Sequence, residues 1–137
     1  MATAKWATPA TRSSNLAGTA LNSLANDSAS SLITYDNSTN RNLYAAVTIK
    51  LGSITPSTGG SITLRVLAGD GTDVPDAVPL DQYTVPLTSG TSAKVAILPM
   101  VRLYPFTMRL SIVNNSGVAF NASSNELYCR DYNEDVT

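Results

Sequence analysis

Apolar and polar residues alternate along most of the chain after residue 32, and this period of two predicts β-strands. In the run LYAAVTIKLGS every odd position from 43 to 51 is apolar, while Thr48 and Lys50 lie between them. The run SITLRVLAG repeats the pattern, with Ile62, Leu64 and Val66 on one face. Each run therefore predicts a strand with one buried and one solvated face.

The stretch between these runs, SITPSTGG, carries Pro56 and the pair Gly59 and Gly60. These residues are typical of a tight reversal, so we expect the two strands to form a hairpin. Weaker strand patterns are separated by turn-forming residues and comprise SLITY, QYTVPL, AKVAIL, FTMRLSIVN, GVAF and ELYCRDY. The sequence thus predicts roughly eight short strands.

No helical pattern appears after Leu32, and the long crossovers that parallel strands require are missing. We therefore predict an all-β protein, an antiparallel β-sandwich that is jelly-roll-like. A seven-stranded immunoglobulin-like sandwich is the alternative, although the Cys, Trp and Cys signature of antibody domains is absent.

Residues 1–31 differ from the rest of the chain, because they consist largely of Ala, Ser, Thr and Asn. We interpret residues 1–31 as an extended N-terminal arm and residues 32–137 as the β-sandwich domain. So few large apolar groups cannot offset an ordering entropy of roughly 1–2 kcal/mol per residue. The prediction is that the arm is disordered in the free protein.

One short helical stripe is compatible with the spacing of Leu16, Ala20, Leu21 and Leu24 in the arm, although Gly18 weakens it. An isolated segment this short and polar is marginal in water. We therefore expect an extended arm rather than a helix, ordered by a surface outside its own domain.

The length of 137 residues fits a single domain. Nine basic and ten acidic residues leave a net charge of -1, and only 14% of residues are charged, against roughly 25% in typical soluble domains. The charges are scattered, which argues against a nucleic-acid partner. No apolar run approaches the roughly 20 residues that span a bilayer, and no signal-peptide pattern is present, so we predict no membrane partner and synthesis in the cytoplasm.

The chemistry of the chain argues against catalysis, because it contains no histidine and only one cysteine, Cys129. Cys129 lies in an apolar stretch and is expected to be a small buried residue. Carboxylates gather only in the loop with Asp70, Asp73, Asp76 and Asp81, whose spacing does not match an EF-hand. We predict a protein that is not an enzyme and needs no cofactor or metal, with calcium at this loop as a minor alternative.

The plan of the whole chain resembles the capsid decoration, or cement, proteins of tailed bacteriophages, in particular those with a jelly-roll body. The most recognisable span is SLITYDNSTNRNLYAAVTIKLGSITPSTGGSITLRVL, preceded by the arm and followed by a β-rich part that ends in RDYNEDVT. The resemblance implies a structural virion protein on the capsid surface. Such a protein binds the outside of the head as a homotrimer and bridges subunits of the major capsid protein.

No residue motif defines that family, so the contact residues are inferred from the arm itself. A large aromatic is the commonest interface hot spot, which makes Trp6 the expected anchor. The other expected contacts with the capsid partner are Lys5, Arg12, Leu16, Leu21 and Leu24. Two other classes remain open, namely a glycan- or receptor-binding module of a tail fibre or spike, and a virion-associated hydrolase.

Overall fold

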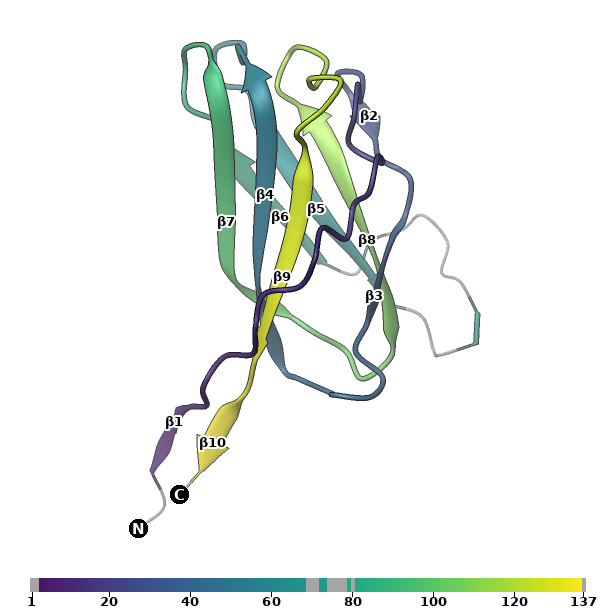
Figure 1. The fold of residues 1–137 in the computed structure, drawn as a ribbon, viewed down its shortest axis with the longest axis vertical. Coiled ribbons are helices and arrows are strands. Elements are labelled where there is room, and N and C mark those ends of the chain that lie inside the picture. The colour runs from purple at the N-terminus through teal and green to yellow at the C-terminus, as the bar shows by residue number, and fades with distance from the viewer. Residues whose placement is uncertain (1–2, 69–71, 74–78, 80, 137) are drawn as a thin grey trace.

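The structure is a computed structural model that describes residues 3–68, 72–73, 79 and 81–136. These residues contain β-strands and no helix, and therefore no helix of the length and hydropathy that crossing a membrane requires (Figure 1). The strands are β1 (Ala4–Trp6), β2 (Ser28–Ala29), β3 (Ile33–Asp36), β4 (Tyr44–Ile54), β5 (Ser61–Ala68), β6 (Asp81–Pro86), β7 (Ser92–Arg102), β8 (Thr107–Asn115), β9 (Glu126–Tyr132) and β10 (Glu134–Val136).

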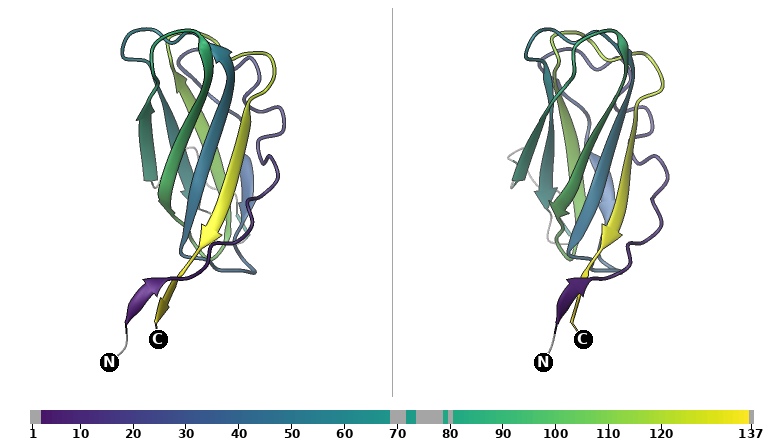
Figure 2. Two further views of the ribbon diagram at one scale, coloured as in Figure 1. Left: turned by 60° about the vertical axis from the view of Figure 1, so that its left-hand side comes forward. Right: turned by 90° about the vertical axis from the view of Figure 1, so that its left-hand side faces the viewer.

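Two sheets pack face to face as the layers of a sandwich (Figure 2). One has the order β7-β4-β9, and the other has the order β2-β8-β5-β6 with β3 also paired to β8. A short ribbon of β1 and β10 extends beyond the body and carries both chain ends (Figure 1). Every pairing is antiparallel. The predicted fold class, an all-β antiparallel sandwich, is confirmed.

The core lies between the two sheets and uses the alternation that the sequence displays. The buried positions of the two longest runs are Ala45, Val47, Ile49 and Leu51 on β4, and Ile62, Leu64 and Val66 on β5. Removing such side chains from water contributes about 25 cal/mol per Å² of apolar area, which makes this layer the main source of stability. Leu43 departs from the pattern and is 47% exposed, because it precedes the strand.

The predicted hairpin between the first two long strands is wrong. β4 pairs with β7 and β9, whereas β5 pairs with β6 and β8, so the segment between them crosses from one sheet to the other. The tight turn itself is present, with Gly59 at a φ of 75° that favours glycine. The stretch GVAF, expected to be a strand, is a bend and an irregular segment in the loop before β9.

The arm lies along the outer edge of β9 over residues 7–16 (Figure 1). Backbone N–H groups of Ala7, Ala10, Ser13 and Leu16 donate to the carbonyl oxygens of Asn133, Asp131, Cys129 and Leu127, at 2.8–2.9 Å. Three arm residues therefore span the length of two strand residues, so the contact is not a regular ladder. Side-chain oxygens complete it, since Ser13 Oγ and Asn15 Oδ1 each accept a β9 backbone N–H at 3.0 Å.

The second half of the arm belongs to the core, which corrects the expectation that a surface outside its own domain orders the arm. Leu21 is fully buried and Ala17 is 6% exposed, while Leu16, Ala20 and Leu24 pack against the same cluster. No helix forms, because Gly18, Ser23 and Asp27 all have positive φ angles, which interrupt a helix. The apolar stripe faces inward from successive turns instead. The structure thus differs from the predicted disorder, since the sandwich orders this segment.

Candidate docking surface

Three aromatic rings meet where the terminal ribbon leaves the sandwich. Tyr44 of β4 and Tyr132 of β9 are directly paired across the strands, and their rings stack with centroids 5.6 Å apart and an interplanar angle of 26°. Trp6 of β1 stands edge-on to both, at 5.9 Å from Tyr44 and 5.5 Å from Tyr132. Such edge-to-face arrangements are the favoured geometry of aromatic pairs and fix the orientation of the indole.

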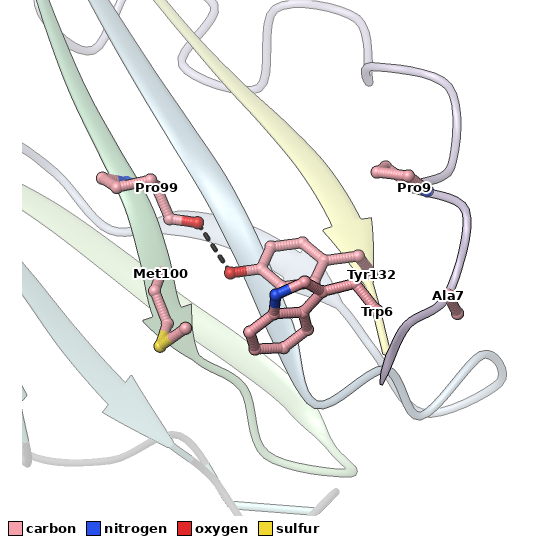
Figure 3. Close-up of a pocket in the computed structure, with 6 residues that line it drawn as sticks. All are labelled: Trp6, Ala7, Pro9, Pro99, Met100 and Tyr132. Atoms are coloured by element: carbon pink, nitrogen blue, oxygen red, sulfur yellow. Dashed lines mark hydrogen bonds between the residues drawn. The ribbon is translucent and has the colours of Figure 1, made fainter. Parts of the chain in front are cut away.

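Trp6 forms one wall of an apolar hollow on the outer surface (Figure 3). The other lining residues are Ala7, Pro9, Pro99, Met100 and Tyr132. The Tyr132 hydroxyl donates to the Pro99 carbonyl oxygen at 2.7 Å, which ties β9 to β7 across the hollow. Trp6 is 55% exposed and Met100 is 48% exposed. We call these six residues the Trp6 hollow, which can receive an apolar side chain of a partner.

Charged groups of the terminal ribbon lie beside the indole. Trp6 is paired with Glu134, and Lys5 with Asp135, across the two strands of the ribbon. Lys5 and Glu134 line a second depression on another side of Trp6, and the Tyr44 hydroxyl donates to Glu134 at 3.4 Å. Apolar and charged contacts are thus available on different sides of one side chain.

The structure divides the predicted contact residues into two groups. Lys5, Trp6 and Arg12 are exposed and reachable by a partner. The Arg12 guanidinium lies 3.9 Å from the centre of the Tyr128 ring, so it also holds the arm to β9. Leu16, Leu21 and Leu24 pack against the chain's own core. The prediction that these three leucines contact a partner is therefore corrected, because the body of the protein already covers them.

The residues that surround Trp6 are not among the contacts predicted from the sequence. Tyr44 and Tyr132 occupy outward-facing positions of strands whose alternation was recognised, so the pattern held a signal for exposed aromatics. Nothing in the local sequence indicates that Pro99 and Met100 approach Trp6. That proximity arises because Pro99 and Met100 lie at an irregularity in the β4 and β7 pairing, where the register shifts between Val101 and Leu98.

Ionisable groups elsewhere in the sandwich are held by structural hydrogen bonds. Asp131 accepts hydrogen bonds from the Tyr35 hydroxyl and from Asn42 Nδ2, and its partial burial raises its pKa. The Tyr104 hydroxyl donates to Asp81 at 2.9 Å, which raises the pKa of Tyr104. Burial raises the pKa of Cys129 to about 12, so this thiol is protonated at neutral pH.

The acidic loop is only partly within the described residues. Asp70 and Asp76 lie outside them, so the minor calcium alternative stays a prediction. Asp73 and Asp81 are described, and no group of three or more possible metal-ligating residues assembles in the described part of the chain.

The chain was compared with family models, curated proteins and solved structures, and none of these comparisons gave a match.

Proposed function

We propose that this protein is a structural virion protein that binds the outer surface of a phage capsid as a trimer and stabilises the head by bridging major capsid protein subunits. The observation that carries the proposal is Trp6, 55% exposed beside an apolar hollow on a ribbon that extends beyond a well-packed sandwich. A large aromatic held in a fixed orientation at the surface loses little entropy on binding and is typical of an interface anchor.

The jelly-roll form of the family is supported by the order of the strands. Counting the arm as a strand gives two four-stranded sheets, arm-β9-β4-β7 and β3-β8-β5-β6, with β2 an additional short strand on β8. With these eight strands, each strand along the chain is followed by a strand of the other sheet. The one exception is β5, which is followed by β6 in the same sheet. This alternation of sheets along the chain is the connectivity of a jelly roll.

The test measures attachment of purified protein to capsids that lack it. Trp6→Ala is expected to weaken attachment by about 2–4 kcal/mol, the range of an interface hot spot. The melting temperature of the free protein should change little, because Trp6 is 55% exposed and lies on the terminal ribbon outside the core. Leu32→Ala, at a residue that is 44% exposed, is the matched control and should attach normally. Equal attachment of all three proteins would refute the role of Trp6.

A glycan-binding module of a tail fibre is the second candidate, and one observation favours it. Trp6 presents an exposed aromatic ring with Lys5 and Glu134 beside it, which combines a stacking surface with hydrogen-bonding groups. Trp6 is the only tryptophan, so its fluorescence reports on this site alone. A saturable change on titration with host-surface glycans would favour this candidate over capsid binding.

A further inference from the structure

The outer faces of the two sheets expose different side chains. Seven large apolar side chains are exposed in the described part of the chain, and four of them lie on the side of the β7-β4-β9 sheet, which is nearest the viewer in Figure 1: Trp6, Val95, Ile97 and Met100. Among the described residues, no large apolar side chain is exposed on the strands of the other sheet. The outer face of the β7-β4-β9 sheet is therefore the apolar side of the sandwich.

These apolar side chains form a strip that is continuous with the Trp6 hollow. Val95 is paired with Lys50 of β4, and Ile97 is paired with Thr48. Because these two residues of β4 point outward, Val95 and Ile97 also lie on the outer face. Met100 lies further along β7 and lines the hollow itself. A partner that covers the hollow therefore also meets the outer face of β7.

Positive charge borders this strip. Four cationic side chains lie on the same outer face, namely Arg102 of β7, Lys50 of β4, Arg130 of β9 and Arg12 of the arm, whose guanidinium covers the outward Tyr128 ring. Glu126 is the acidic residue among the outward positions of the three strands, and its Oε2 lies 3.9 Å from Lys50 Nζ. A chain with a net charge of -1 thus has a face with excess positive charge.

Two of these cations are available to a partner. Arg102 is exposed beside Leu43 in a surface depression, and its guanidinium makes no hydrogen bond or ion pair with the residues that the structure describes. Arg130 is also exposed, and its Nε donates to the Ala10 carbonyl oxygen at 2.8 Å, which leaves its two terminal nitrogens for other acceptors. A guanidinium binds a carboxylate through two parallel hydrogen bonds, so carboxylates are the groups that this face can recognise.

We propose that the outer face of the β7-β4-β9 sheet docks on the capsid, against a patch of the major capsid protein that is both apolar and acidic. The inference rests on the proposed function, and it adds which face makes the contact and the chemistry of the partner surface. Apolar side chains of the capsid protein fill the Trp6 hollow and cover Val95 and Ile97. Its carboxylates pair with Arg102 and Arg130.

Charge complementarity favours this occupant over a second copy of the chain. The same face of a second copy is also positive and would repel. The outer face of the opposite sheet carries Arg65 and Arg109 against one outward acidic residue, Asp36, so it offers no acidic patch either. Exposed aliphatic side chains such as Ile97 favour a protein over a nucleic acid, whose phosphates they do not bind.

The first test measures attachment of variants to capsids that lack the protein. Arg102→Gln should weaken attachment severalfold, and Arg102→Glu by about tenfold or more, because like charges that face each other across an interface are strongly unfavourable. Arg109→Glu makes the same charge reversal on the outer face of the opposite sheet and should attach normally. Circular dichroism checks that each variant is folded.

Salt provides a readout that a loss of structure would not give. Attachment of the wild type should weaken as sodium chloride rises from about 0.05 M to about 0.5 M, because salt screens exposed charges. Arg102→Gln should show a smaller dependence on salt.

The apolar strip is tested separately with Ile97→Thr, which keeps the branched shape of the side chain. This variant should weaken attachment about fivefold, since it removes apolar surface from the contact, and its salt dependence should equal that of the wild type. Leu32→Thr is the control at an exposed apolar residue away from this face and should attach normally.

The outcomes separate the inference from the proposed function. If the wild type attaches, and Arg102→Glu and Arg109→Glu weaken attachment equally or not at all, the inference is overturned and the proposed function stands. A wild type that does not attach to capsids would refute the proposed function, and the inference with it. Light scattering and titration with single-stranded DNA test the other occupants. A molar mass that changes in Arg102→Glu, or DNA binding that this variant abolishes, would overturn the inference.

Discussion

The two edges of the three-stranded sheet β7-β4-β9 have opposite surroundings. The edge of β9 is covered by the chain's own arm over residues 7–16, through backbone hydrogen bonds and the side-chain oxygens of Ser13 and Asn15. The edge of β7 is uncovered in the described structure and exposes Val95 and Ile97. One sheet thus has a closed edge and an open edge.

The two edges therefore differ in chemistry: polar residues of the arm cover β9, whereas β7 exposes apolar side chains. The arm needs few apolar side chains along β9, because small polar residues supply the acceptors that β9 backbone N–H groups require. Its stability depends instead on Leu21, which anchors the following segment in the core. The open edge instead leaves the apolar side chains of Val95 and Ile97 exposed.

Two truncations should separate the halves of the arm and give the largest effect. Deleting residues 2–12 removes no buried side chain from the described residues, so the sandwich should still fold with a modestly lower melting temperature. Deleting residues 2–30 also removes Ala17 and Leu21 and uncovers β9, so the protein should lose its cooperative unfolding transition. Calorimetry of both proteins checks this. Two similar transitions would show that the arm is a dispensable cover.

Replacing the anchor alone should have the next largest effect. Leu21→Ala leaves a cavity in the core and should lower the free energy of unfolding by about 2–5 kcal/mol, measured by urea denaturation. Leu32→Ala is the control for the same change at an exposed site and should cost little. An equal, small loss for both variants would mean that the arm residues are not part of the cooperative core.

The sequence was a good guide to strands and a poor guide to their partners. Alternation located β4, β5 and β9, since burial of one face is a local property of a strand. The turn at 53–60 was also recognised, but turn residues do not specify which sheet the next strand joins, so the hairpin was mispredicted. Leu21 was recognised as part of an apolar stripe, yet the low hydrophobicity around it concealed the core it enters.

The candidate site was only partly predictable for a related reason. Trp6 stands out by composition as the only tryptophan. Its neighbours Tyr132 and Met100 come from distant parts of the chain, and they are brought together by the pairings of β1 with β10, of β4 with β9 and of β4 with β7. Long-range pairing of this kind leaves no local signal in a single sequence.

At the open edge, Lys94→Ala should destabilise the loop 87–91 without adding charge to β7. Hydrogen bonds to a charged group contribute about 1.5–3 kcal/mol, and this variant removes the shared donor of three loop oxygens and of Ser92 Oγ at the start of β7. Lys50→Ala is the control, because the Lys50 side chain is 45% exposed and its Nζ lies 3.9 Å from Glu126 Oε2, in a surface ion pair worth at most about 1 kcal/mol. Chemical denaturation should show the larger loss for Lys94→Ala, and the reverse order would contradict it.

At the closed edge, Asn15→Ala should have a smaller effect of about 1–2 kcal/mol, because Asn15 Oδ1 accepts the backbone N–H groups of Leu127 and Ala17, and each hydrogen bond typically contributes about 1 kcal/mol. The variant leaves the Leu127 N–H without its side-chain acceptor. Hydrogen exchange at that amide should accelerate, while exchange of strand β7 stays unchanged. Asn40→Ala, in an exposed loop, is the matched control. Unchanged protection of Leu127 would show that the arm does not close this edge in solution.

The smallest effect is the pH dependence of stability that Asp131 contributes. The backbone carbonyl of Asp131 accepts a hydrogen bond from the arm at the closed edge. Burial of its side chain raises the carboxyl pKa from the usual 3.8. A carboxyl with a raised pKa binds its proton more tightly in the folded state, so its contribution to stability falls as pH rises from about 3.8 through the folded pKa. Above that range the contribution is constant. The stability of the wild type relative to Asp131→Asn should therefore decrease over this window.

Asp36 provides a control of opposite sign on the other sheet. Hydrogen bonds from the Ser38 hydroxyl and backbone N–H lower its pKa, so the stability it contributes is present above the unfolded pKa of 3.8 and is lost as pH falls through the lower folded pKa. The stability of the wild type relative to Asp36→Asn should increase as pH rises. Urea denaturation of the three proteins across acidic pH gives both slopes. Slopes of the same sign would mean that the hydrogen bonds from Tyr35 and Asn42 outweigh the partial burial of the Asp131 carboxyl and lower its pKa.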